Sequence, residues 1–349
     1  MRPSSRFLTA AAATAAGGLA YAALEAQAFT LRRFTVPVLP PGAPSVRVLH
    51  VSDLHLVPRQ RRKAAWLRGL AALEARAFTL RRVTVPVLPA GSAALRVLHV
   101  SDLHLVPRQR SKAAWLRGLA GLSPDLVVST GDNLAAVDAV PAVLDAYGPL
   151  LERPGVFVLG SNDYWAPRPK NPARYFLPQG GSRRIVGVRL PTEQLVGGFT
   201  RAGWLDLTNR RGELEVAGVR LGFVGVDDPH LNRDQYPVGS PAAGAFAIGV
   251  THAPYRRVLD AMTGEGVGLL LAGHTHGGQL RVPGIGALVT NCDLPRRQAR
   301  GLSSWRAPDG DSTALHVSAG LGTSPYTPVR FACRPEATLL TLTAEDAGT

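Results

Sequence analysis

The chain has 349 residues, of which 46% are hydrophobic and 18% charged, so it can bury a sizeable core and lacks the composition of a disordered protein. Its net charge is +14, with 39 Lys and Arg against 25 Asp and Glu, and this excess favours anionic partners such as phosphorylated substrates or acidic lipids. The basic residues are scattered and form no run with interleaved aromatic residues, which argues against a nucleic-acid-binding protein.

The first 29 residues have the pattern of a secretory signal peptide or a short membrane anchor. Two arginines precede an uncharged, Ala-rich run at residues 7–23, and Ala26-Gln27-Ala28 resembles a signal-peptidase cleavage site. The run is short and weakly apolar for a spanning helix, and a soluble Ala-rich helix is the alternative. We expect residues 1–29 to bring the protein to the cell membrane or beyond it.

A tandem duplication follows this segment. Residues 23–71 and 72–120 are near copies that differ at 8 of 49 positions. Each copy carries one Asp-x-His motif, which is Asp53 and His55 in the first copy and Asp102 and His104 in the second. A single fold has one equivalent place for this motif, so one copy has to be displaced from it.

The number of residues between each Asp-x-His motif and the next motif favours the second copy as the one that lies in the site. Asp102 lies 30 residues before Asp132, which is a usual length for one strand–helix–strand step, whereas Asp53 lies 79 residues before it. We therefore expect Asp102 and His104 to be the working pair. The opposite choice stays open, because the second copy could be the displaced one.

Six short aliphatic runs along the chain each end in a polar cluster, and they read as buried strands at residues 95–100, 125–129, 155–159, 219–224, 245–250 and 267–271. Helical patterns separate several of them, at residues 112–119, 138–147 and 255–262. This alternation predicts an α/β layered fold, in which ligands bind at the carboxyl ends of the strands. Further strand-like runs near the C-terminus extend the expected single domain over residues 72–345.

The polar clusters together supply ligands for two divalent metal ions, namely Asp102, His104, Asp132, an amide near residue 162, His252, His274 and His276. A two-metal hydrolytic site needs oxygen and nitrogen ligands and one shared carboxylate. Each motif is weak when it is taken singly: Gly-Asp-Asn at residues 131–133 is also a common turn, and a lone His252 is more often a core residue. The ordered set at successive strand ends favours a metal site over chance.

The order of these motifs resembles that of the calcineurin-like metallophosphoesterases, and within them the membrane-associated bacterial branch of YkuE-like and YaeI-like phosphodiesterases. The motifs are Asp-x-His, Gly-Asp-Asn, Gly-Ser-Asn-Asp, Thr-His and Gly-His-Thr-His, and the resemblance covers roughly residues 95–342. It implies an α/β fold of two mixed β-sheets packed as a sandwich and flanked by helices. It also implies a binuclear metal centre with a bridging hydroxide that hydrolyses phosphodiester or pyrophosphate bonds.

The resemblance distributes the ligands over two ions. It implies Asp102, His104 and His276 for the first ion, His252, His274 and Asn162 for the second, and Asp132 as the bridge. The ions could be Mn, Fe, Zn or similar divalent metals, since mixed Asp, His and Asn ligation does not decide among them.

The chain departs from the family pattern at Gly160-Ser161-Asn162-Asp163, where the family has Gly-Asn-His followed by Asp or Glu. Aligned without a gap, Ser161 replaces the ligand Asn and Asn162 replaces the histidine that acts near the leaving group. A shift of one residue would make Asn162 the ligand, which is the interpretation we prefer. Asn162 and Asp163 are the expected catalytic residues, with Asp163 or a water assisting the leaving group. Arg168, Lys170 and Arg108 are candidate phosphate contacts.

The sequence thus predicts a hydrolase that acts on ester bonds of a phosphorylated small molecule or lipid. We expect a membrane-associated or extracytoplasmic monomer that binds no nucleic acid. One alternative is a catalytically degenerate metal-binding protein at the membrane, which the Gly-Ser-Asn-Asp departure would fit. The other is a membrane-surface binding module, which the apolar start and the basic composition would fit.

Overall fold

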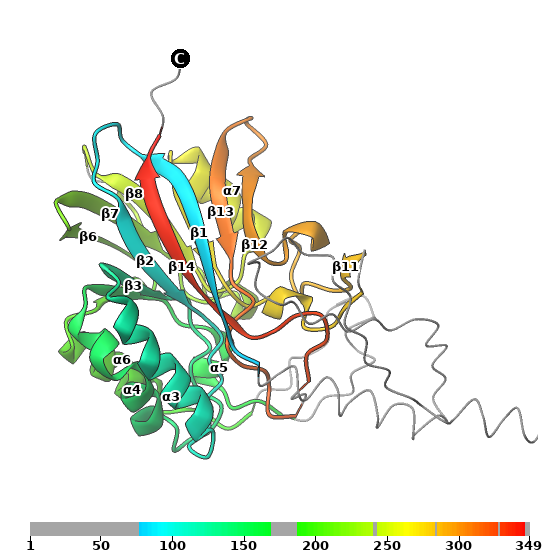
Figure 1. The fold of residues 1–349 in the computed structure, drawn as a ribbon. Coiled ribbons are helices and arrows are strands. Elements are labelled where there is room, and N and C mark those ends of the chain that lie inside the picture. The colour runs from blue at the N-terminus through cyan, green and yellow to red at the C-terminus, as the bar shows by residue number, and fades with distance from the viewer. Residues whose placement is uncertain (1–76, 169–186, 240–242, 283–284, 327–328, 346–349) are drawn as a thin grey trace, which may run out of the picture. The chain divides into compact units, whose positions relative to one another are not determined.

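The computed structural model describes residues 77–168, 187–239, 243–282, 285–326 and 329–345 (Figure 1). The predicted N-terminal signal or anchor at residues 1–29 and the first copy of the duplication, with Asp53 and His55, lie outside these residues. Among the described helices, none is both long enough and apolar enough to cross a membrane.

Two six-stranded mixed sheets form the body of the protein. The first has the order β1 (Thr79–Leu88), β14 (Glu336–Ala344), β2 (Leu95–Val100), β3 (Leu126–Ser129), β4 (Gly155–Phe157) and β5 (Leu205–Asp206). The second has the order β12 (Gly301–Arg306), β13 (Ser312–Val317), β9 (Leu269–Ala272), β8 (Phe246–Thr251), β7 (Val219–Gly225) and β6 (Arg210–Val216). A small antiparallel pair, β10 (Arg281–Val282) and β11 (Gly286–Ala287), stands apart from both sheets.

The two sheets pack face to face because their strands alternate between two apolar faces. In β3, Leu126 and Val128 join the cluster between the sheets, whereas Val127 joins the cluster under the helices. In β9, Leu269 faces the inter-sheet cluster and Leu270 the opposite side. Each of these side chains is fully buried, and the burial of one such side chain contributes about 1.5–3 kcal/mol to the stability of the fold.

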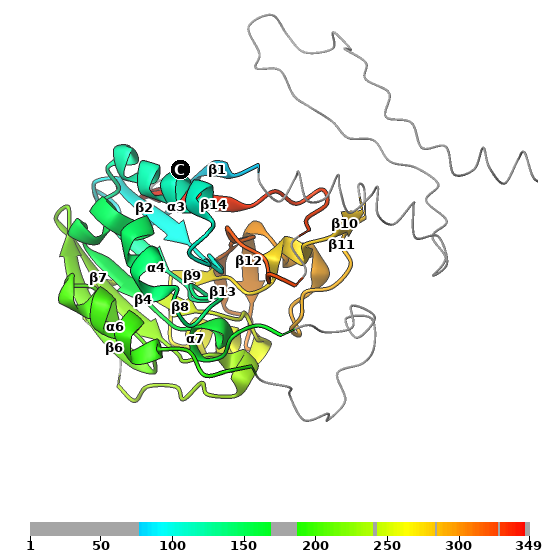
Figure 2. The ribbon, with the colours of Figure 1, turned by 90° about the horizontal axis from the view of Figure 1, so that it is seen from below.

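Helices cover the outer faces of the sandwich. The helices α3 (Arg110–Gly118), α4 (Val140–Tyr147) and α6 (Thr192–Arg201) gather on the first sheet, and α7 (Arg256–Gly264) packs on the second (Figures 1 and 2). The remaining helices are the short α5 (Ser161–Tyr164) and the 3-10 turns η1 (Leu119–Leu122), η2 (Gly148–Glu152), η4 (Pro229–Leu231), η5 (His276–Gly278) and η6 (Arg296–Gln298). A sandwich of two mixed sheets flanked by helices confirms this part of the predicted fold class.

The second copy of the duplication supplies β1, β2 and α3, and so belongs to the first sheet and to its helical cover. The parallel strands β2, β3 and β4 end at the same edge of that sheet. The parallel strands β7, β8 and β9 do the same in the second sheet. The polar segments that follow five of these six strands, all except β7, carry the candidate ligands.

Candidate metal centre

Five of the predicted ligands have a left-handed backbone, with φ of 49° at Asp102, 42° at His104, 56° at Asp132, 68° at His274 and 49° at His276. Residues other than glycine rarely adopt this conformation, and each such residue costs on the order of 1–3 kcal/mol. All five lie in segments that follow strands of the two packed sheets. Strain concentrated in this way is typical of functional sites, where the rigid sheets on either side enforce it.

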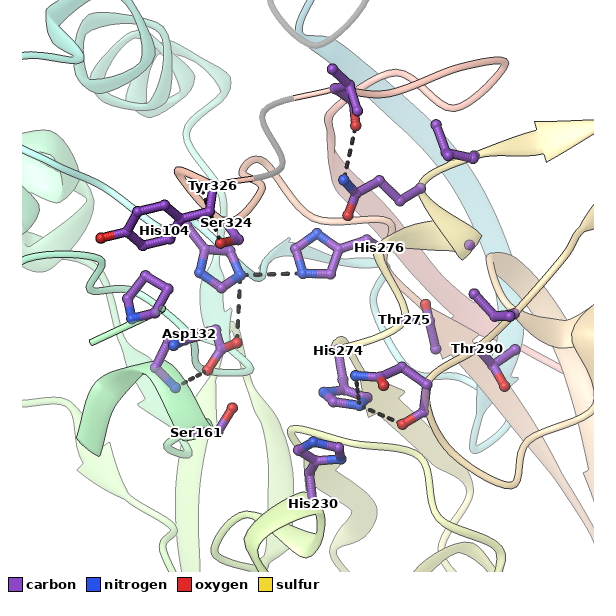
Figure 3. Close-up of a pocket in the computed structure, with 18 of the residues that line it drawn as sticks. His104, Asp132, Ser161, His230, His274, Thr275, His276, Thr290, Ser324 and Tyr326 are labelled. Atoms are coloured by element: carbon purple, nitrogen blue, oxygen red, sulfur yellow. Dashed lines mark hydrogen bonds and ion pairs between the residues drawn. The ribbon is translucent and has the colours of Figure 1, made fainter. Parts of the chain in front are cut away.

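The first group of ligands is Asp102, His104 and His276. The Nε2 atoms of His104 and His276 are 3.2 Å apart, and Asp102 Oδ1 lies 3.6 Å from His276 Nε2 and 4.0 Å from His104 Nε2. One ligand atom from each of the three residues lies within 4.8 Å of the others, so the three could hold a single ion. Figure 3 places His104 and His276 facing each other in the pocket.

Asp132 connects this group to the second one. Its Oδ2 atom is 3.4 Å from His104 Nε2 and 3.6 Å from His252 Nε2. The His252 Nε2 atom is in turn 3.3 Å from His274 Nδ1. A carboxylate between two sets of imidazoles has the position that a bridging ligand requires.

Main-chain carbonyl groups orient the imidazole rings. His252 Nδ1 donates to the Thr130 carbonyl at 2.7 Å, and His276 Nδ1 donates to the Gly322 carbonyl at 3.0 Å. His274 Nε2 lies 3.1 Å from the Asn291 carbonyl. A carbonyl oxygen can only accept a hydrogen bond, so the ring nitrogen that faces it carries the proton. The other ring nitrogen then turns its lone pair toward the cluster.

This arrangement tests whether the residues fit a metal ion. The lone pairs of His252 Nε2 and His274 Nδ1 face each other across 3.3 Å, which is unfavourable unless a cation or a proton lies near both. A buried set of carboxylates and imidazoles whose lone pairs converge fits divalent ions of the borderline kind. The chemistry of the donor set therefore agrees with metal binding.

The pKa shifts of the candidate ligands also agree with metal binding. Burial lowers the pKa of His274 to about 3 and that of His276 to about 4, so both rings stay neutral, which is the form that binds metal. Burial would raise the pKa of Asp102, but His276, His252 and His104 outweigh it and hold the pKa of Asp102 below its usual range.

Asp132 and His252 behave differently, because they face each other. Burial raises the pKa of Asp132 to about 8 against the opposing effect of His252, and Asp102 and Asp163 add to the rise. Burial lowers the pKa of His252, but Asp132 and two further carboxylates raise it to about 9. The pair therefore retains a proton near neutral pH, at the place where a bound ion would supply the positive charge.

Asn162, which the sequence suggests as a ligand of the second ion, lies beside Asp132. Its main-chain N–H donates to Asp132 Oδ1 at 2.6 Å, and its side-chain Nδ2 donates to the Trp165 carbonyl at 2.9 Å. Asn162 and Ser161 both line the pocket over the ligands.

Asp163, which the sequence suggests as a catalytic residue, has a different environment. Its side chain is fully buried, and its two oxygens accept the main-chain N–H groups of Asp132, Asn133, Leu134 and Gly160. It is not among the residues that line the pocket. A carboxylate committed to four backbone donors fits a positioning role better than the expected assistance to the leaving group.

Sequence reasoning missed His230, which lines the pocket on the side of His274 (Figure 3). The Asp228 side chain accepts the His230 N–H at 2.9 Å and so caps η4, and the His230 ring lies 4.5 Å from the His274 ring. His230 Nδ1 is 3.1 Å from the Tyr255 hydroxyl. The polar cluster after residues 219–224 is the signal that could have pointed to this segment.

Arg330 is a second residue that the sequence did not reveal. It is fully buried, and its Nη2 donates to the carbonyls of Ala319 at 2.7 Å and Gly322 at 2.6 Å. Since the Gly322 carbonyl also accepts from His276, Arg330 fixes the loop that orients this ligand.

The ligands open into a pocket of about 260 Å³. Besides candidate ligands, His230 and Arg168, its lining includes apolar residues from the segments next to β10 and β11 and from the loop before β14. Of the candidate phosphate contacts, Arg168 lines the pocket, Arg108 is exposed and does not, and Lys170 lies outside the described residues.

Comparison with known proteins agrees with this geometry. A sequence model of the calcineurin-like phosphoesterases matches residues 95–278. The uncharacterized metallophosphoesterase YkuE of Bacillus subtilis (strain 168) is 29% identical over 229 residues, which cover 63% of this chain and 68% of YkuE. Phosphodiesterase YaeI of Escherichia coli (strain K12) is 28% identical over 222 residues, which cover 63% of this chain and 70% of YaeI.

Among solved structures, a 5'-nucleotidase precursor from Thermus thermophilus superposes with a TM-score of 0.39 and 13% identity. The superposition covers 72% of this chain and 56% of the nucleotidase.

Proposed function

Because this chain belongs to the calcineurin-like phosphoesterase family, we propose that it hydrolyses phosphodiesters at a binuclear metal centre. As a member of the family it is a metal-dependent hydrolase of phosphoester bonds. The proposal of a binuclear centre rests on the Asp132 carboxylate, whose Oδ2 is 3.4 Å from His104 Nε2 and 3.6 Å from His252 Nε2. A carboxylate shared by two ions requires such a position.

The residues would divide between two metal positions. Asp102, His104 and His276 would hold the first ion, His252 and His274 the second, and Asp132 both. Ser161 or Asn162 would add an oxygen to the second position. When bound, the ions would activate a water for attack on phosphorus and neutralise charge on the phosphate oxygens.

The chain's own residues have three tasks in this reaction. The carbonyls of Thr130 and Gly322 keep the ligand rings in the tautomer that binds metal. Arg168, on the pocket wall, offers a positive charge to the phosphate. His230, also on the wall, offers a ring nitrogen to an oxygen of the phosphate or the leaving group.

Location and partners are a further part of this proposal, and they rest on the sequence. Residues 1–29 support placement at the membrane or outside the cytoplasm. The basic composition supports a phosphorylated small molecule or lipid as the substrate. We propose a monomer that binds no nucleic acid.

The duplication provides a matched control for the test. Hydrolysis of bis-(p-nitrophenyl) phosphate with Mn²⁺ would be compared in the full chain, Asp102→Ala and Asp53→Ala, with the metal content measured for each. We expect Asp102→Ala to lose at least about 100-fold in kcat/KM, together with part of the metal, and Asp53→Ala to keep both. Activity lost only with Asp53 would assign the site to the first copy.

The alternative function has its own signature in the same experiment. The Gly-Ser-Asn-Asp segment has no histidine where the family has one. Two bound ions per chain without hydrolysis of this or a pyrophosphate substrate would identify a metal-binding protein that lacks the chemistry.

A further inference from the structure

One wall of the pocket beside the candidate ligands is apolar. It is formed by Leu280, Leu288, Val289, Tyr326 and Val329, which we call the apolar wall. These residues come from three separate segments: the residue before β10, the segment after β11 and the loop that leads to β14. Five of the candidate ligands also line this pocket, so a molecule that fills it contacts both those ligands and the wall.

Part of the apolar wall is exposed to solvent. Leu280 is 42% exposed and Tyr326 is 53% exposed, and the nearby Ile285, in the turn between β10 and β11, is 76% exposed. Single exposed hydrophobic residues are ordinary on protein surfaces. Apolar side chains that gather at one pocket mouth are more characteristic of a ligand-binding surface.

Three polar side chains of this region are bonded to the protein backbone. The Thr290 hydroxyl donates to main-chain carbonyls at 3.0 and 3.1 Å, the Thr275 hydroxyl donates to Ala299 at 2.7 Å, and the Gln279 amide donates to Val329 at 2.9 Å. Their donor groups are therefore directed at the protein. A sugar or a nucleobase needs polar partners from its binding site, and this wall offers few.

The same pocket also carries two charged side chains besides its histidines. Among the lining residues, Arg168 is the one Lys or Arg and Asp132 is the one carboxylate. The pocket thus combines ionic groups, suited to a phosphate, with apolar side chains.

We propose that the apolar wall binds the alkyl group of an alcohol esterified to the substrate phosphate, so that the enzyme prefers phosphodiesters of apolar alcohols over those of small polar ones. This inference rests on the proposed phosphodiesterase function. The apolar chain would cover Leu280 and Tyr326 while the phosphate lies against the candidate ligands. Each methylene that leaves water for the wall adds binding free energy.

A series of substrates tests the preference. The Mn²⁺-loaded full chain would be assayed with p-nitrophenyl phosphodiesters whose second ester group is methyl, butyl or octyl, below their micelle concentrations. We expect kcat/KM to rise roughly twofold for each added methylene between methyl and butyl, which is less than full burial would give because the wall is partly open.

Two matched variants locate the effect. Leu280→Ser should flatten the rise with chain length. Leu302→Ser is the control, since Leu302 is 41% exposed on β12 and does not line the pocket. It should preserve the full rise.

The outcomes separate the inference from the function on which it rests. Turnover of the methyl ester without any gain for butyl or octyl would overturn the inference and leave the phosphodiesterase standing. If no ester is hydrolysed, the proposed function fails, and calorimetric binding of methylphosphonate against octylphosphonate decides the inference instead. Equal affinity for the two phosphonates would overturn it, and octylphosphonate binding at least about tenfold tighter, lost in Leu280→Ser, would support it.

Discussion

The Asp163 carboxylate accepts the main-chain N–H of Asp132 at 2.8 Å, so the residue after β4 holds the candidate bridging ligand after β3. The same carboxylate accepts the N–H groups of Asn133 at 2.7 Å and Gly160 at 3.0 Å. These bonds hold the Asp132 backbone in its left-handed conformation, with φ of 56°. A strained ligand loop is stable only while its surroundings enforce it.

Replacement of Asp163 by Asn tests this positioning role. An amide in place of the carboxylate turns one acceptor into a donor that faces backbone N–H groups, so we expect the free energy of unfolding to fall by about 2–4 kcal/mol. Metal affinity should fall with it, because Asp132 loses its support. Urea unfolding and metal titration would measure both quantities.

The control for this variant is Asp145→Asn, since the Asp145 side chain is 69% exposed and pairs with Arg117 at the surface. It should change the stability by less than about 1 kcal/mol. If Asp163→Asn keeps its stability and metal affinity but loses kcat, Asp163 acts in catalysis, as the sequence suggests.

The sheets were the most predictable part of the molecule, because short aliphatic runs in a layered α/β fold have few alternatives. The run at residues 95–100 is the strand β2 over the same residues, and the run at residues 125–129 differs from β3 by one residue. The helix α6 was missed, since Gly197 and Gly198 interrupt its apolar pattern.

The clustering of the candidate ligands could be predicted because each closely follows a strand, whereas the residues that support them could not be found from the sequence. Arg330 and His230 reach the site from segments without a strong pattern, and their partners are main-chain carbonyls or rings distant in sequence. The role of Asp163 depends on backbone N–H groups about 30 residues away, and every residue type except proline has such a group.

Gly160 is predicted to be irreplaceable for steric reasons. A Cβ atom there would overlap Asp132 Oδ1 and approach His252 Nδ1 to 2.7 Å. The φ of Gly160 is −113°, which any residue can adopt, so the effect of Gly160→Ala would come from this crowding alone. We expect the variant to lose one of two bound metal ions and at least about tenfold in activity.

Gly118→Ala provides the comparison for that substitution. Gly118 ends α3, and nothing lies within 4 Å of the position that its Cβ would take. The change should leave metal content and activity intact and stabilise the helix by up to about 1 kcal/mol. Equal metal content in both variants, measured by elemental analysis, would contradict the steric argument.

Lys112 gives a prediction about pH. Burial, with a smaller effect of Arg330, lowers the pKa of the Lys112 amine to about 7, while its Nζ donates to the Leu103 carbonyl at 2.8 Å. Between pH 7 and the ordinary value of 10.5 the unfolded chain binds this proton and the folded chain does not. The free energy of unfolding therefore gains up to about 1.4 kcal/mol per pH unit from this residue as the pH rises above 7.

Lys112→Met isolates that contribution, because Met keeps the buried stem and cannot titrate. We expect the stability difference, wild type minus variant, to be flat below pH 7 and to increase in favour of the wild type from pH 7 to pH 9. Urea unfolding at five pH values would measure it, and every other titrating group cancels in the difference. A difference that is constant up to pH 9 would show that the amine stays charged in the fold.

His230 is predicted to serve the reaction more than the metal. Its ring lines the pocket, and the centre of the ring is 4.5 Å from the centre of the His274 ring. Its Nδ1 is 3.1 Å from the Tyr255 hydroxyl, and this contact fixes the orientation of the ring. We expect His230→Ala to lower kcat/KM by about 10- to 100-fold with two ions still bound, because the ligand rings are oriented by other groups. His230→Gln, which keeps a hydrogen-bonding side chain, should recover part of the loss, and Tyr255→Phe should cost less than His230→Ala. Loss of one metal ion from His230→Ala would instead assign His230 to the support of His274.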